Sequence, residues 1–61
     1  MTVMVHLLRG NAHKFTNIGN IEEKVDVSNS PLLHEFLLYS QNNDVLVGRY
    51  LVEDVLKLEV I

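Results

Sequence analysis

The chain has 61 residues, of which 48% are apolar, and its 5 basic and 8 acidic side chains give a net charge of −3. So short a chain can build only one hydrophobic core, so we expect residues 1–61 to form a single small domain. The absence of cysteine excludes a disulfide scaffold and a thiolate zinc site. The acidic balance argues against a basic nucleic-acid module. We expect a cytoplasmic protein without membrane contact, because neither a secretory leader nor an apolar stretch of about 20 residues is visible.

Short clusters of Asn, Gly, Ser and Pro divide the chain into runs of about five to nine residues, the usual spacing of strands. A two-residue turn at 10–11 would place Leu8 opposite His13 and His6 opposite Phe15. The run 21–27 alternates apolar and charged residues, which predicts a strand with one solvated face.

The C-terminal half predicts two consecutive hairpins. A type I′ turn at 42–43 places Leu38 opposite Val47, and a turn at 53–54 then places Leu51 opposite Leu56. Both pairings place the residues of the shared strand on the same faces of the sheet. A slip of one residue would move every apolar side chain to the opposite face. One face then collects Phe36, Leu38, Val47, Leu51, Leu56, Leu58 and Val60, and the other carries the row Glu35, Tyr50 and Lys57.

These patterns predict an all-β fold, a small antiparallel meander of five or six strands that is barrel-like or SH3-like. One alternative stays open. Ser30-Pro31 suits the N-cap and first position of a helix, and Leu32, Leu33, Phe36 and Leu37 would share one helical face. The alternative fold is therefore α+β, with a four-stranded sheet and one helix at 31–41.

The order of features resembles that of short β-rich proteins of unassigned function from Gram-positive bacteria and their prophages. The resemblance is carried by an opening strand, a Phe-bearing strand with a short turn, a hairpin, and a closing strand that ends in an acidic-plus-aliphatic pair. Their counterparts here are residues 3–7, 14–18, 35–39 and 55–60. The resemblance implies a compact antiparallel meander or small barrel, a phage or prophage setting, and no active site to transfer.

The sequence predicts no catalytic, cofactor-binding or metal-binding residue. His6 and His13 would project from one face at diagonal positions, but no spacing typical of a metal site supports them. The carboxylates fall at turns or on solvated faces, and no serine stands in a nucleophile elbow. We therefore expect a protein that is not an enzyme and that needs no cofactor.

Excess apolar surface is the feature that points to function. The second face of the meander would carry Leu37, Tyr39, Leu46 and Ile61, and a chain this small hides only one face by itself. We expect a self-associating protein-interaction module, with a homodimer favoured and an unidentified protein partner. The alternative function is that of a small barrel binding single-stranded nucleic acid through Tyr50, Arg49 and Lys57, with Tyr39 beside them.

Overall fold

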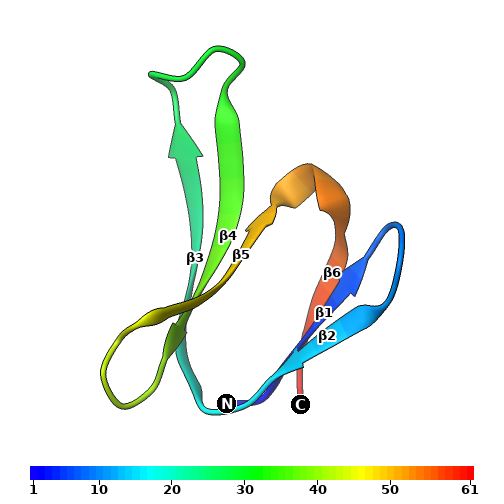
Figure 1. Ribbon diagram of the computed structural model, residues 1–61, viewed down its shortest axis with the longest axis vertical. Coiled ribbons are helices and arrows are strands. Elements are labelled where there is room, and N and C mark those ends of the chain that lie inside the picture. The colour runs from blue at the N-terminus through cyan, green and yellow to red at the C-terminus, as the bar shows by residue number, and fades with distance from the viewer.

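A computed structural model describes residues 1–61 (Figure 1) and has six β-strands. The elements are β1 (Val3–Leu7), β2 (Ala12–Phe15), β3 (Ile18–Asp26), β4 (Leu33–Ser40), β5 (Leu46–Leu51), the 3-10 turn η1 (Val52–Asp54) and β6 (Val55–Val60). The predicted all-β class is confirmed. The alternative helix at 31–41 is wrong, because that segment contains β4. The chain forms no helix that could span a bilayer.

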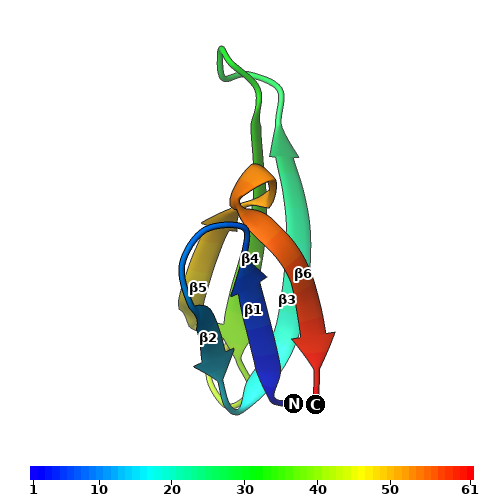
Figure 2. The same ribbon diagram turned by 90° about the vertical axis from the view of Figure 1, so that its right-hand side faces the viewer.

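The strands form two antiparallel sheets of three strands each. The order in the first, here called the terminal sheet, is β2-β1-β6, and the order in the second, the central sheet, is β3-β4-β5. Away from the end that carries both termini, β3 and β4 diverge from the terminal sheet, whereas β5 approaches β6 and η1 joins the two (Figure 1). They do not close into a barrel. Seen from the side, the β3–β4 hairpin projects beyond the terminal sheet (Figure 2).

The core lies between the sheets and is small. It consists of Val3 and Val5 from β1, Ile18 from β3 and Leu38 from β4. Because consecutive side chains of a strand point to opposite faces, the residues next to Val5 in β1 and next to Leu38 in β4 point to the outer faces of the two sheets. Partly buried side chains surround the core, namely Leu7, Phe15, Ile21, Tyr50, Val55 and Leu58.

One side of the sandwich is closed by contacts between β2 and β5. Gly48 is buried, and a Cβ at that position would lie 3.1 Å from Cζ of Phe15. The ring of Phe15 meets that of Tyr50 edge-on, and the Tyr50 hydroxyl lies 2.7 Å from Nδ1 of His13. A glycine in β5 thus lets an aromatic ring of the other sheet approach the backbone.

Backbone contacts tie the two sheets together at the termini. The amino group of Met1 donates to the carbonyl of Ile18 at 2.7 Å, and the amide of Ile18 donates back to the carbonyl of Met1 at 2.8 Å. The next residue is Gly19, where an added Cβ would lie 2.8 Å from Cα of Gln41. Only glycine fits this close approach of two backbones.

The β4–β5 hairpin pairs as predicted, but its register is right only near the turn. Tyr39 faces Leu46, as a turn at 42–43 requires. A bulge after this pair then shifts the ladder, so that Leu38 faces Gly48 and not Val47. Because one extra residue reverses the faces of a strand, Tyr50 points to the core and Arg49 points outward.

The predicted pairing of β5 with β6 is wrong. β6 leaves the central sheet through η1 and pairs with β1, where Leu58 faces Val5 and Val60 faces Val3. The chain thereby places β1 between β2 and β6 and covers the apolar side of the central sheet with a second layer. The expected sorting of residues over three consecutive strands therefore does not occur.

The first hairpin also differs from the prediction. Val5 faces His13 and His6 faces Ala12, because the loop is longer than two residues and contains Gly10 with φ of 101°. This register turns His13 toward the inside of the terminal sheet and His6 toward the outside. The two histidines therefore do not share a face.

Candidate interaction surfaces

The outer face of the central sheet contains an ion pair between a buried carboxylate and an exposed guanidinium. Glu35 and Arg49 project from β4 and β5 on the side opposite to Leu38, and Glu35 is only 7% exposed. The guanidinium binds both carboxylate oxygens, from Nε to Oε2 and from Nη2 to Oε1 at 3.0 Å. These hydrogen bonds hold the pKa of Glu35 below its ordinary value against the opposing effect of burial. The pair joins β4 to β5 on this face, and Lys24 of β3 lies opposite Glu35 on its other side.

Leu37 lies in the middle of the same outer face. Its partners across the sheet are Glu22 on β3 and Arg49 on β5. Leu37 is 6% exposed although the core lies on the other side of its strand. Both partners have long side chains, whose aliphatic stems commonly cover an apolar residue on a sheet.

The four expected interface residues are not all brought together. Leu37, Tyr39 and Leu46 share the outer face of the central sheet. Tyr39 is half-buried and Leu46 is 43% exposed. Ile61 follows β6 in the terminal sheet and is 70% exposed, so it belongs to a different surface. Ile61 was expected beside the other three residues because the sequence predicted a β5–β6 hairpin. That hairpin does not form.

The three candidates for nucleic-acid binding lie on three different surfaces. Arg49 is on the outer face of the central sheet, where Glu35 binds it. Tyr50 points to the core, and burial raises the pKa of its hydroxyl. Lys57 lies on the terminal sheet, opposite His6. The structure forms no stacking platform from these residues.

Each histidine has a polar partner of its own. Nε2 of His6 lies 2.9 Å from a carboxylate oxygen of Glu59, and Nε2 of His34 lies 2.8 Å from one of Glu23. The contact with His6 and the charge of Lys57 lower the pKa of Glu59. No group of three or more His, Cys, Asp or Glu side chains is placed to hold a metal ion.

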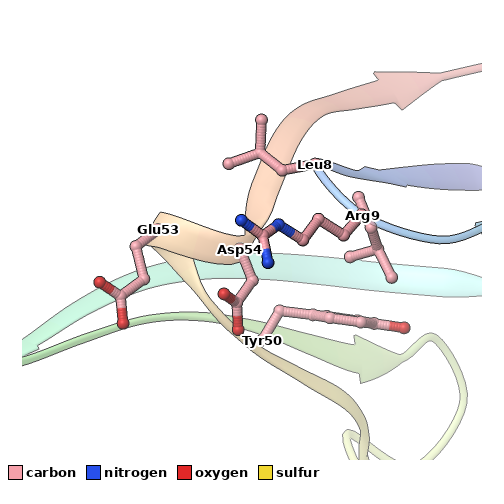
Figure 3. Close-up of a pocket in the computed structure, with 6 residues that line it drawn as sticks. Leu8, Arg9, Tyr50, Glu53 and Asp54 are labelled. Carbon is pink, nitrogen blue, oxygen red and sulfur yellow. The ribbon is translucent and has the colours of Figure 1, made fainter.

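A cleft of about 470 Å³ opens where the loop after β1 meets η1 (Figure 3). The side chain of Arg9 extends across it toward Asp54, and the ring of Tyr50 forms part of its wall (Figure 3). Its lining residues are Leu7, Leu8, Arg9, Tyr50, Glu53 and Asp54. One cation, two carboxylates and aliphatic groups give it mixed polarity, and it contains no nucleophile paired with a base.

The free edge of β6 is the surface that sequence reasoning missed. β6 is an edge strand of the terminal sheet, and its backbone bonds to β1 only. Leu56 and Val60 on this strand are 63% and 61% exposed. The alternation of aliphatic and charged residues over 55–60 correctly predicted a strand. The sequence predicted β5 as its partner, whereas the partner is β1. Figure 2 shows β6 at the margin of the molecule.

No protein-family model, no characterised protein and no solved structure matches this chain.

Proposed function

We propose that this protein is a non-enzymatic protein-interaction module that associates with itself. The observation that carries this proposal is the imbalance between its core and its surface. Seven of the 61 residues are buried and four apolar side chains form the core, whereas eleven large apolar residues are exposed. A chain of this length is marginally stable alone, and with no cysteine it lacks the disulfide route to extra stability.

Two surfaces support association in different ways. The outer face of the central sheet offers Tyr39 and Leu46, but the charged Glu35–Arg49 pair lies beside them. The edge of β6 offers exposed aliphatic side chains together with unpaired backbone groups. Unpaired backbone at an edge strand is a template for a further strand, so the β6 edge supports association more strongly.

Binding of single-stranded nucleic acid is not proposed, since the residues expected to carry it lie apart. A stacking platform needs aromatic rings and cations on one surface. Here Tyr50 points inward and Arg49 is bound to a carboxylate.

Self-association is tested by the mass of the protein in solution and by its stability. We expect sedimentation at micromolar concentration to give a mass above that of one 7.0 kDa chain. Because a dimer dissociates as it unfolds, each tenfold rise in concentration adds about 1.4 kcal/mol to the free energy of unfolding. For a small domain this moves the urea midpoint upward by roughly 0.5–1.4 M. A monomeric mass with a midpoint independent of concentration would refute the proposal.

A further inference from the structure

We propose that β6 pairs with β6 of a second copy of this chain, antiparallel and centred on Leu58, so that Lys57 of each copy faces Glu59 of the other. This inference rests on the proposed self-association and specifies its surface and register. The two terminal sheets would merge into one sheet of six strands in the order β2-β1-β6-β6-β1-β2. A two-fold axis would pass through the middle of the pair, as in most homodimers.

The backbone of β6 has the right groups on its free edge. The amide of Ile61 donates to the carbonyl of Thr2 at 2.9 Å, so Ile61 points its backbone toward β1. Backbone groups alternate in direction along a strand, so Glu59 and Lys57 also point toward β1, and Val60 and Leu58 point away from it. None of the backbone hydrogen bonds joins β6 to a strand other than β1. Leu58 and its counterpart can therefore exchange a reciprocal pair of hydrogen bonds.

Charge selects one register among those that the backbone allows. Backbone directions permit the two-fold axis to pass at Lys57, Leu58 or Glu59. An axis at Lys57 would place two lysines opposite each other, and an axis at Glu59 would do the same with two glutamates. Like charges directly opposite destabilise a sheet, whereas the axis at Leu58 creates two Lys–Glu pairs. These pairs are also of the type without backbone hydrogen bonds, in which side chains lie closest.

The apolar side chains of β6 fit the same register. Leu58 faces Val5 across the sheet and would meet Leu58 of the second copy, at the margin of the core. Leu56 is the extra residue at the register shift between β6 and β1, and it lies on the part of the strand that would face Val60 of the second copy. These two side chains are 63% and 61% exposed in the single chain. The pairing thus covers the apolar groups that the small sandwich leaves open.

The other edges of the sheets are protected against such pairing. β2 has only four residues and carries a lysine, and β3 carries Glu22, Glu23 and Lys24 in succession. β5 is bulged and packs against Phe15 through Gly48. Short length, charges and bulges are the usual means by which proteins block edge strands. β6 is six residues long, and its own shift in register, at Leu56, lies next to η1, so residues 57–60 pair regularly with β1. Its lysine and its glutamate face each other under two-fold symmetry.

Charge reversal tests the register. Lys57→Glu places glutamates opposite glutamates, and Glu59→Lys places lysines opposite lysines. We expect each variant alone to weaken the dimer by about tenfold or more. An equimolar mixture of the two variants forms attractive pairs at both positions, so we expect heterodimers with an affinity within about threefold of the wild type. Sedimentation of each variant and of the mixture gives these affinities.

Lys14→Glu is the matched control. Lys14 lies on β2, at the other edge of the same sheet. Met4 of β1 separates it from Glu59, since Met4 pairs with Lys14 on one side and with Glu59 on the other. The control changes the net charge as Lys57→Glu does, and we expect it to leave the dimer affinity within about threefold of the wild type. In a mixture of the Lys14→Glu and Glu59→Lys chains, the heterodimer keeps one Lys–Glu pair and gains one Lys–Lys pair, so we expect it to bind more weakly than the heterodimer of Lys57→Glu with Glu59→Lys.

The outcomes separate this inference from the proposed function. If the wild type self-associates but Lys57→Glu behaves as Lys14→Glu does, the β6 register is wrong and self-association stands. A wild type that stays monomeric refutes both. If the single variants fail to fold, recovery of the far-ultraviolet circular dichroism of a β-protein on mixing them supports the register, and no recovery overturns it.

Discussion

Glu35 is a buried carboxylate on a sheet face that does not touch the core, and Arg49 supplies its partner from the neighbouring strand. Two hydrogen bonds from one planar guanidinium satisfy both oxygens and fix the rotamers of both side chains. Lysine could not replace Arg49 here, because a single ammonium cannot reproduce this bidentate geometry. Arg49 is also the cross-strand partner of Leu37.

The Glu35–Arg49 pair predicts a loss of stability in acid. The guanidinium lowers the pKa of Glu35 in the folded chain below its value in the unfolded chain. A group with a lowered folded pKa contributes its full stabilisation above the unfolded pKa and loses it as the pH falls through the folded pKa. We therefore expect the urea midpoint to fall as the pH drops below about 4.5, the ordinary pKa of a glutamate.

Glu35→Gln tests this assignment. The variant should be less stable than the wild type at neutral pH, and its acid-induced loss should be smaller because one titrating group is gone. Asp26 and Glu59 also have lowered pKa values, so part of the acid dependence will remain. Glu53→Gln, at an exposed carboxylate on η1, is the control. If the urea midpoint of Glu35→Gln falls with pH as steeply as that of the wild type, the ion pair does not cause the loss of stability in acid.

At the scale of single elements, β4 is the strand that is covered on both faces. Leu38 is fully buried in the core, and Leu37 is nearly as buried on the opposite face. Sequence patterning predicted that Leu37 would be an exposed interface residue. It could not reveal that Glu22 and Arg49 flank Leu37, because their positions depend on the registers of two neighbouring strands.

Leu37→Ala should therefore destabilise the fold as a core truncation does. We expect a loss of about 2–5 kcal/mol in the free energy of unfolding, measured by urea titration. Leu46→Ala removes the same atoms from the same face at a residue that is 43% exposed, and we expect a loss of less than about 1 kcal/mol. Equal effects of the two substitutions would show that Leu37 is not covered within the chain.

Local sequence signals predicted the strands but not all of their partners. Alternation and turn residues identified β3, β4 and the β4–β5 hairpin, since each depends on neighbours in sequence. The register of that hairpin failed beyond Tyr39, because a bulge of one residue leaves no clear signal in an apolar run. The β1–β6 pair joins residues that lie 48 (Leu7↔Val55) to 57 (Val3↔Val60) positions apart, and no local pattern specifies such a contact.

The candidate interaction surface was also predicted correctly only as far as it depended on local sequence. The sequence predicted an excess of exposed apolar surface, and the structure has eleven large apolar residues exposed. The sequence assigned that excess to one face through a hairpin that does not form, which joined Ile61 to Leu37. The β6 edge could be identified only after β1 was known to occupy the other side of the strand.

At the scale of the whole molecule, the sandwich is closed on one side and open on the other. Contacts between Phe15 and Gly48 and between His13 and Tyr50 join β2 to β5. No backbone hydrogen bond joins β6 to β3 on the opposite side. A second copy at β6 would extend the terminal sheet on the open side and leave the closed side unchanged.

This arrangement predicts an alternating pattern of amide hydrogen exchange along β6. The amides of Lys57 and Glu59 point toward β1 and should be protected whether or not a second copy is bound. Those of Leu58 and Val60 point to the free edge, so we expect protection only in the dimer. Exchange followed by nuclear magnetic resonance at high and low protein concentration measures this difference.

Lys57→Glu provides the comparison within one concentration, because it disfavours the dimer while the β1–β6 pairing stays in place. In this variant Leu58 and Val60 should exchange rapidly, and Glu59 should exchange as slowly as the stability of the monomer allows. Protection of Leu58 that is independent of both concentration and the substitution would mean that its amide is satisfied within one chain. The free edge would then not be the surface through which two copies meet.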